Sequence, residues 1–265
     1  MTMRVCIAGA TGWVGKPLCL AVSQAPDLSL VGAVSRSAAG KSLKEILGGA
    51  APDLRISRSV AEALQIPTDV LVEYTHASAV KVHVLTAISK GVNVVIGTSG
   101  LTSQDFAEIN LAAMQNRVGV IAAGNFSITA LLLQRFACQA ARYLSQWEII
   151  DFASDGKEDA PSGTARELAF RLSEIGKPEI TIPVEKTVGE RDSRGTNLDG
   201  SQVHSIRLPG YVISIEAIFG GTDERLSIRH DAGNGTAPYI QGTLLAIRKV
   251  QAYTGLVRGL DRILE

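Results

Sequence analysis

The sequence predicts an α/β protein in which a parallel sheet covered by helices is followed by a second, α+β domain. Before residue 126, short apolar runs alternate with amphipathic stretches, which is typical of repeated βα units. From Ile128 onward, a long apolar helix, polar loops and two neighbouring strand-like runs replace this alternation. We therefore expect one domain at 1–126 and another at 127–237. A C-terminal helix over 238–265 is expected to pack back on the first domain.

The first domain is expected to contain five strands and the helices that connect them. Strands are predicted where short runs of Val, Ile and Leu occur, and helices where apolar residues recur every three or four positions. The strands are Val5–Ala8, Leu28–Val34, Val70–Glu73, Val92–Ile96 and Val118–Ala122, and the helices are Lys16–Ser23, Ser78–Ser89 and Ser103–Gln115.

The second domain is expected to mix helices with an antiparallel pair of strands. In chain order it contains a helix over Ile128–Tyr143, a strand over Trp147–Phe152, a helix from Ser162 to about Ile175, polar turns from Gly189 to Ser201, and strands over Tyr211–Phe219 and Glu224–His230. These last two strands should pair across the turn Gly220–Asp223. The final segment, Pro238–Leu264, is predicted to be helical with a break at Gly255.

Composition excludes several classes of function. The 26 Lys and Arg residues balance 26 Asp and Glu residues, so neither nucleic acid nor an anionic membrane is an expected partner. No apolar run approaches the roughly 20 residues that span a bilayer. The N-terminus has no secretory signal pattern, which predicts a cytoplasmic protein. Cys6, Cys19 and Cys138 lack metal-ligand spacing and are expected to be reduced core thiols, so no metal site is predicted.

A glycine-rich loop directly follows the first predicted strand and precedes a helix. It reads Gly9-Ala10-Thr11-Gly12-Trp13-Val14-Gly15. Glycine permits a tight turn, and the N–H groups of a helix N-terminus bind pyrophosphate. The loop therefore predicts a dinucleotide site.

The end of the second strand predicts which dinucleotide binds. An acidic residue about 20 positions after such a loop holds the ribose 2′-hydroxyl of NAD. This chain has Ser35 and Arg36 there instead, a combination suited to a 2′-phosphate. NADPH is expected to be preferred, with NADH also possible.

Two large groups of dinucleotide enzymes do not fit the rest of the chain. No Tyr is followed four residues later by Lys, as short-chain dehydrogenases require, and the segment Gly124–Ser127 has no thiol of the kind that semialdehyde dehydrogenases use. The chain does contain Lys157 shortly before Ser162-Gly163-Thr164, where Ser162 is a good helix cap. This spacing fits a proton-donating Lys beside a carboxylate-binding helix start, or equally a solvated Lys before an ordinary capped helix.

The run KEDAPSGTA at 157–165 resembles the signature of the 4-hydroxy-tetrahydrodipicolinate (dihydrodipicolinate) reductase family of bacterial lysine biosynthesis. The resemblance extends over nearly the whole chain. It includes the glycine loop, Glu73-Tyr74-Thr75, Gly97–Leu101, Gly124–Ser127 and Ser205–Gly210. The resemblance implies a Rossmann-type cofactor domain, an α+β substrate domain whose open mixed sheet mediates a homotetramer, and hydride transfer from NAD(P)H to a cyclic unsaturated dicarboxylate.

The resemblance also implies a role for each matching residue. Lys157 would be the catalytic proton donor, and the substrate would be bound by Ser154, Ser162, Gly163 and Thr164. The cofactor would be bound by Gly9, Ala10, Thr11, Gly12, Trp13, Val14, Gly15, Ser35, Arg36, Gly97, Thr98, Ser99, Ala123, Gly124, Asn125 and Phe126.

The chain departs from the family pattern at one important place. Family members carry a pair of histidines four and three positions before the Lys, where this chain has Ala153 and Ser154. A missing acid–base group costs about 10²–10⁴-fold in rate, so another group such as His76 could replace it. The substrate is either the lysine-pathway intermediate or another carboxylated cyclic imine. Two alternatives remain open: an imine reductase or amino-acid dehydrogenase on the same scaffold, and a non-catalytic relative that binds the cofactor.

Overall fold

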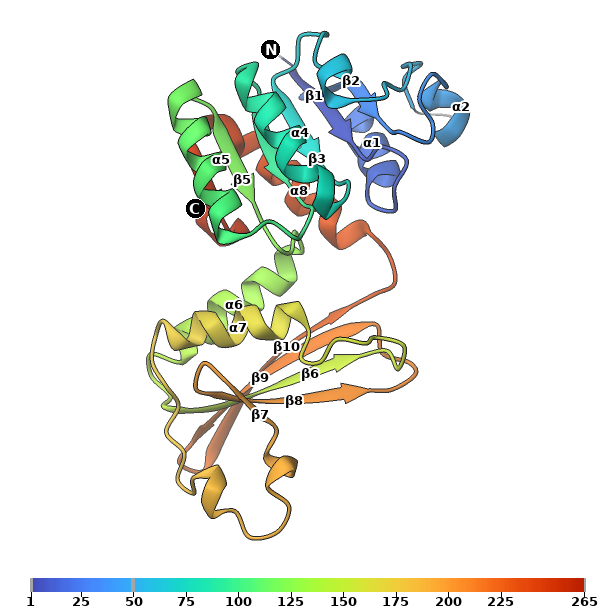
Figure 1. Ribbon diagram of the computed structural model, residues 1–265. Helices are drawn as coiled ribbons and strands as arrows, with labels where there is room; N and C mark the ends of the chain where they lie inside the picture. The colour runs from blue at the N-terminus through green and yellow to red at the C-terminus, as the bar shows by residue number, and fades with distance from the viewer. Residues whose placement is uncertain (1, 49–50, 265) are drawn as a thin grey trace. The chain divides into compact units, whose positions relative to one another are not determined.

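The computed structural model describes residues 2–48 and 51–264, which form two compact units. One unit comprises Met1–Ile128 and Thr236–Glu265, and the other comprises Thr129–Gly235. Each unit is built around its own sheet, parallel in the first and mixed in the second (Figure 1). The predicted α/β fold class is therefore confirmed.

The first unit contains a six-stranded parallel sheet in the order β11-β5-β4-β3-β1-β2. Its strands are β1 (Met3–Ala8), β2 (Leu28–Val34), β3 (Val70–Glu73), β4 (Asn93–Ile96), β5 (Gly119–Ala122) and β11 (Gly255–Arg258). Its helices are α1 (Gly15–Gln24), α2 (Leu43–Leu47), α3 (Val60–Ala63), α4 (Ala77–Ser89), α5 (Ser103–Asn116) and α8 (Ala237–Lys249), with 3-10 turns η3 (Val250–Ala252) and η4 (Leu260–Ile263). Apolar side chains of α4 and α5 bury one face of this sheet.

The direction of the strand connections reverses between β1 and β3 of the parallel sheet. After β1 the chain passes through α1 to β2, whereas after β3 it passes through α4 to β4 on the opposite side. Adjacent strands β1 and β3 thus lead into helices that move apart, which is the position where open α/β sheets bind ligands. The glycine loop (residues 9–15) and the segment after Glu73 both lie at this point.

The prediction that Pro238–Leu264 is helical with a break at Gly255 is only partly correct. Helix α8 already ends at Lys249, and Gly255–Arg258 form the parallel edge strand β11 beside β5. Gly255 has a φ of +87°, a left-handed conformation, and it is the first residue of this strand. The strand forms because β5 would otherwise expose an unpaired edge, which four residues of β11 cover. This final segment belongs to the first unit, where α8 packs beside α1.

The second unit contains a five-stranded mixed sheet in the order β10-β9-β6-β8-β7, in which only β6 and β8 run parallel. Its strands are β6 (Gln146–Ala153), β7 (Thr196–Leu198), β8 (Ser201–Arg207), β9 (Ile213–Gly221) and β10 (Glu224–Ala232). Its helices are α6 (Ile128–Ala140) and α7 (Gly163–Ser173), with 3-10 turns η1 (Val184–Lys186) and η2 (Arg191–Arg194). Helices α6 and α7 lie over one face of the sheet (Figure 1).

The antiparallel pairing of β9 with β10 agrees with the sequence prediction, but β8 was not expected. Sequence patterns assigned residues up to Ser201 to turns and did not recognise Ser201–Arg207 as a strand. The strand does not show the usual alternation of apolar and polar residues. Gln202 is polar but buried, and the charged Arg207 pairs with Asp151 on the neighbouring strand. This strand places Arg207 directly opposite Ala153 on β6.

Candidate active site

The glycine loop is shaped by close approaches of its own backbone. Gly9 has a φ of +87°, and a Cβ there would lie 2.0 Å from the carbonyl oxygen of Tyr74. A Cβ on Gly15 would lie 1.9 Å from the carbonyl oxygen of Gly9. The N–H of Gly12 donates a 2.9 Å hydrogen bond to this same oxygen. Only glycine fits at positions 9 and 15, because any side chain would push the loop off the end of the sheet.

Helix α1 begins directly after the glycine loop, and no side chain caps its N-terminus. Val14 occupies the N-cap position and has no side-chain acceptor for the first N–H groups of the helix. These groups can therefore bind an anion. Trp13 is 64% exposed and meets the ring of Tyr239 edge-on, with 5.8 Å between ring centroids, while Ala10 is buried beneath the loop.

Hydroxyl groups gather where the sequence predicts the adenosine ribose. The hydroxyl oxygens of Thr11 and Ser35 are 2.7 Å apart, and that of Ser37 lies 3.4 Å from Ser35. The structure thus brings together two predicted cofactor residues that are 24 positions apart in the chain. Arg36 is exposed beside them, at the end of β2. No carboxylate occurs between Val34 and Ala38 to repel a 2′-phosphate.

The loops after β4 and β5 carry the residues predicted to line the nicotinamide. A Cβ on Gly97 would lie 2.2 Å from the ring of Tyr74, so this glycine makes room for the aromatic side chain. The Thr98 hydroxyl oxygen accepts a 2.8 Å hydrogen bond from the N–H of Thr75. Phe126 is buried 6.1 Å from the Tyr74 ring, centroid to centroid. The remaining predicted residues, Ser99, Ala123, Gly124 and Asn125, lie on the same two loops.

A buried carboxylate supports this edge of the sheet, a role that the sequence analysis did not assign to it. Glu73 is completely buried at the end of β3, where its Oε1 accepts a hydrogen bond from the Thr75 hydroxyl and lies 3.1 Å from His83 Nδ1. Its Oε2 has no hydrogen-bond partner within the described part of the chain. In the sequence, Glu73 is visible as an acidic residue that directly ends an apolar strand and as part of the Glu73-Tyr74-Thr75 family motif.

In the second unit, the segment after β6 carries Lys157. We call residues 154–162 the lysine loop. The N–H of Lys157 donates to the carbonyl of Ser154 (3.1 Å), which closes a turn, and its ammonium donates to Asp159 Oδ1 at 2.5 Å. The hydrogen bond from Lys157 holds the pKa of the Asp159 carboxyl below its ordinary value. Lys157 is thus a partly exposed cation whose position is defined by Asp159.

The lysine loop ends at the N-terminus of α7. The Ser162 hydroxyl caps the helix by accepting a 3.3 Å hydrogen bond from the N–H of Ala165. Gly163 is exposed, with no atom within 4 Å of the position a Cβ would take, and Thr164 is partly exposed. The first turn contains no acidic residue, so the helix start is open and favourable for a carboxylate.

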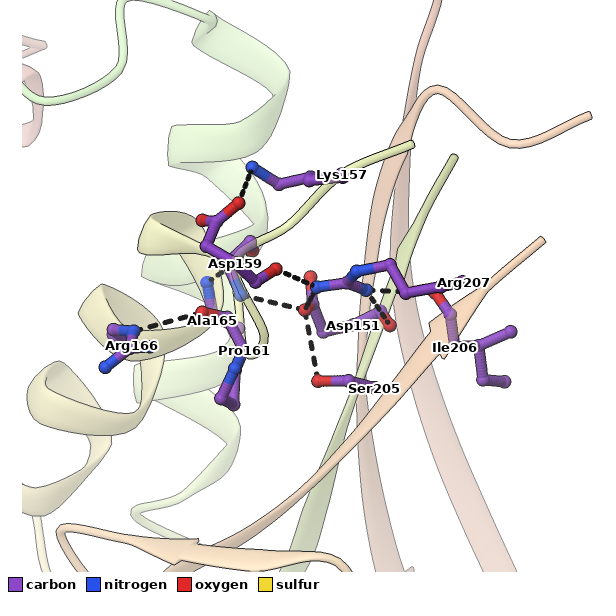
Figure 2. A network of polar contacts seen from close by, with 10 residues as sticks. Asp151, Lys157, Asp159, Pro161, Ala165, Arg166, Ser205, Ile206 and Arg207 are labelled. Atoms are coloured by element: carbon purple, nitrogen blue, oxygen red, sulfur yellow. Dashed lines mark hydrogen bonds and ion pairs between the residues drawn. The ribbon is translucent and has the colours of Figure 1, made fainter. Parts of the chain in front are cut away.

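A buried ion pair beneath the lysine loop was also missed. Asp151 on β6 and Arg207 on β8 are joined by a 2.8 Å contact between Oδ2 and Nη2 (Figure 2). Asp151 also accepts a hydrogen bond from the N–H of Ser162. The Ser205–Gly210 segment pointed to a family likeness, but nothing in the sequence linked Arg207 to Asp151, which is 56 residues away.

Three histidines, His76, His204 and His230, each have a hydrogen-bond partner in their own unit. His76 caps α4, with Nδ1 accepting from the N–H of Ser78 (3.3 Å), so only its Nε2 is available to a ligand. His204 Nε2 lies 2.7 Å from Glu148, and His230 Nδ1 lies 3.2 Å from the Thr129 hydroxyl. Ala153, at one position of the family histidine pair, is fully buried, and Ser154 is partly exposed.

Comparison with known proteins identifies the family. Residues 3–126 match the family described as dihydrodipicolinate reductase, N-terminus, and residues 129–264 match dihydrodipicolinate reductase, C-terminus. The chain is 37% identical to 4-hydroxy-tetrahydrodipicolinate reductase of Desulfitobacterium hafniense, with 99% of each chain covered. It is 38% identical to the enzyme of the same name from Synechococcus elongatus, with 98% of each covered.

The chain belongs to the dihydrodipicolinate reductase family. A solved structure of dipicolinate-bound dihydrodipicolinate reductase from a Paenisporosarcina species superposes with a TM-score of 0.87 at 30% identity, covering all of both chains. An amine dehydrogenase from Mycobacterium smegmatis, 15% identical, shares the fold with a TM-score of 0.69 over 99% of this chain and 96% of its own. The expected family is thereby confirmed.

Family membership makes this chain an NAD(P)H-dependent reductase, with a Rossmann-type domain that binds a pyridine nucleotide. This result decides against the non-catalytic alternative. Among the described residues, no helix is long and apolar enough to cross a membrane. No group of three or more His, Cys, Asp or Glu residues in 2–48 and 51–264 is arranged to hold a metal ion.

Proposed function

We propose that this reductase transfers a hydride to the C=N or conjugated C=C bond of a carboxylated cyclic imine, with Lys157 supplying the proton. The reduction adds one hydride and one proton, so a proton donor must stand beside a binding site for the carboxylate. The lysine loop provides both within one short segment, since Lys157 precedes the open start of α7 at Gly163. This juxtaposition is the observation that carries the proposal.

The proposed roles of the second unit follow from its local geometry. The N–H groups of Gly163 and Thr164, with the Thr164 hydroxyl, bind one substrate carboxylate at the helix N-terminus. The Lys157 ammonium, which Asp159 holds by a hydrogen bond, donates its proton to the bound substrate. Ser154, the first residue of the lysine loop, stands where the family has a histidine and is proposed to contact the substrate. Ala153 and Ser154 make this side of the proposed substrate site smaller and less polar than a histidine pair would.

The proposed cofactor is NADPH, which supplies the hydride when bound. Its pyrophosphate fits the uncapped start of α1 behind Gly12 and Val14. The hydroxyls of Thr11 and Ser35 lie close enough together to bind one 2′-phosphate, with the exposed Arg36 beside them. The loops Gly97–Ser99 and Ala123–Phe126 are proposed to line the nicotinamide. NADH remains usable, because it lacks only the phosphate.

A homotetramer is proposed from the family likeness and from the sheet of the second unit. Helices α6 and α7 cover one face of this sheet. The opposite face carries the partly exposed Ile150, Ile206 and Ile218, with charged neighbours such as Glu216 and Arg229. Such a mixed apolar and charged surface suits association between identical chains. Light scattering should give four times the chain mass of 28.0 kDa, and a monomeric mass would reject this proposal.

The cytoplasm is the proposed compartment, in keeping with cysteines that form no disulfide and with the lysine-biosynthetic chemistry of the family. The decisive experiment is NADPH oxidation with enzymatically generated 4-hydroxy-tetrahydrodipicolinate, compared with pyrroline- and piperideine-carboxylates and with acyclic 2-oxo acids plus ammonia. We expect turnover of at least one carboxylated cyclic imine. Turnover restricted to the acyclic pairs would instead identify an amino-acid dehydrogenase, and no turnover of any substrate would reject the proposal.

A further inference from the structure

The lysine loop rests on a buried ion pair between two neighbouring strands. Asp151 on β6 is completely buried, and the side chain of Arg207 on β8 is only 16% exposed. The strands run parallel, with Asp151 opposite Ser205 and Ala153 opposite Arg207. Both charged residues therefore belong to the sheet, and they lie near the end of β6 at which the lysine loop begins (Figure 2).

The pair binds the lysine loop at two points. Asp151 Oδ2 accepts a 2.8 Å hydrogen bond from the N–H of Ser162, the capping residue of α7. Arg207 Nη2 donates a 2.7 Å hydrogen bond to the carbonyl of Asp159. Between these two anchored residues lie only Ala160 and Pro161. The position of the end of the loop is thus fixed relative to the sheet.

These contacts continue to Lys157. Arg207 holds the backbone of Asp159, and the Asp159 carboxylate accepts the hydrogen bond from the Lys157 ammonium. We propose that Asp151 and Arg207 are positioning residues, which orient Lys157 through Asp159 and hold the carboxylate-binding start of α7 through Ser162. This inference rests on the proposed function, because it assigns a purpose to Lys157 and α7.

The ion pair is poorly suited to a purely stabilising role. Burying two charges carries a large desolvation cost, which is recovered only when every polar atom of the pair has a hydrogen-bond partner. Here Asp151 Oδ1 and Arg207 Nε are buried without a hydrogen-bond partner in the described residues. What the pair does achieve is two directed hydrogen bonds to the lysine loop. An apolar pair of similar volume would pack in the sheet but could not form them.

The test is a double-mutant cycle between Arg207→Met and Lys157→Ala in the full-length protein, measured with the cyclic imine that the wild type reduces. If Arg207 acts through Lys157, Arg207→Met lowers kcat about tenfold or more in the wild-type background. In the Lys157→Ala background it lowers kcat less than about twofold, because the group it positions is gone. Equal losses in both backgrounds would overturn the proposal.

Two further variants separate positioning from folding. Asp151→Asn combined with Arg207→Met removes both buried charges, so its Tm should recover towards the wild-type value while kcat stays low. Recovery of kcat together with Tm would show a structural role only. Arg207→Lys retains the charge but loses the fork that bridges two acceptors, and we expect a smaller fall in kcat with little change in Tm. Unchanged kcat in Arg207→Lys would also contradict the proposal.

A control variant and the Kd for NADPH show whether the effect is specific to Arg207 and to the lysine loop. Arg171→Met, on α7 in the same unit, removes an Arg that forms an ion pair with Glu167 one helical turn away, and its kcat should remain within about twofold of wild type. The Kd for NADPH should not change in any Arg207 variant. Failure of the proposed function is seen separately: the wild type would reduce no imine, or Lys157→Ala would retain full activity.

Discussion

The two loops that lead into helix starts, the glycine loop before α1 and the lysine loop before α7, achieve their shapes by opposite means. The shape of the glycine loop depends on the absence of side chains at Gly9 and Gly15. At both positions the backbone passes so close to a carbonyl oxygen that a Cβ atom would not fit. The lysine loop is determined by side chains from outside it, since Asp151 and Arg207 bind Ser162 and Asp159. A loop that is fixed by its own backbone suits the pyrophosphate, which is the same in every dinucleotide cofactor. A loop that is held by side chains from outside can change with those side chains and so accommodate a different substrate.

The largest expected effect contrasts Gly15, in the glycine loop, with Gly163, which directly follows the lysine loop. Gly15→Ala places a methyl group 1.9 Å from the Gly9 carbonyl oxygen, so the backbone must move, at a cost of about 1–3 kcal/mol. We expect a lower Tm and at least a tenfold weaker Kd for NADPH, measured by calorimetry. Gly163→Ala places its methyl group in open space at a helix start, so its Tm should not fall. Equal Tm losses in the two variants would contradict the contrast between the loops.

A smaller effect is expected from the cation beside the glycine loop. Arg36→Ala removes the proposed contact to the 2′-phosphate of NADPH, and a charge-assisted contact of this kind is worth about 1.5–3 kcal/mol. We expect the KM for NADPH to rise about tenfold or more while the KM for NADH stays within about twofold. Steady-state kinetics with each cofactor measures both values. A parallel rise of the two KM values, or a wild type that clearly prefers NADH, would remove Arg36 from the predicted role.

The smallest effect concerns the thiols that flank the glycine loop. Burial raises the pKa of Cys6 on β1 and of Cys19 on α1 to about 12. Because the pKa is raised, the reactive thiolate is scarce at pH 8, about one molecule in ten thousand. We expect both thiols to resist iodoacetamide in the native protein, as followed by peptide mass spectrometry, and to react in Gly15→Ala. Rapid labelling in the wild type would show that the glycine loop opens readily.

The first unit was more predictable from sequence than the second for a physical reason. Its strands and the glycine loop depend on local features, namely apolar runs and glycines close together in the chain. The edge strand β11 was missed because it forms only to cover β5, more than 130 residues earlier in the chain. Arg207 was missed because its partner Asp151 is 56 residues away, and a buried charge looks like an exposed one in sequence.

The candidate site divides in the same way. Lys157, Ser162 and Gly163 were recognised because they lie together in one motif, and the structure gives Ser162 the expected capping hydrogen bond. The buried Glu73 was not recognised as support for the cofactor edge, because only the fold brings it against His83. Residues of the proposed anion site could be predicted from sequence because they are neighbours in the chain, whereas Asp151 and Arg207, which bind the lysine loop, come from distant strands.

The most direct test of the account is Lys157→Ala, assayed for both turnover and NADPH affinity. The lysine loop is proposed to supply the proton, and the glycine loop is proposed to bind the cofactor. We therefore expect kcat for the cyclic imine to fall about 10²–10⁴-fold while the Kd for NADPH remains within about twofold of the wild-type value. Unchanged kcat would contradict the account, because the lysine loop would then contribute no proton to the reaction.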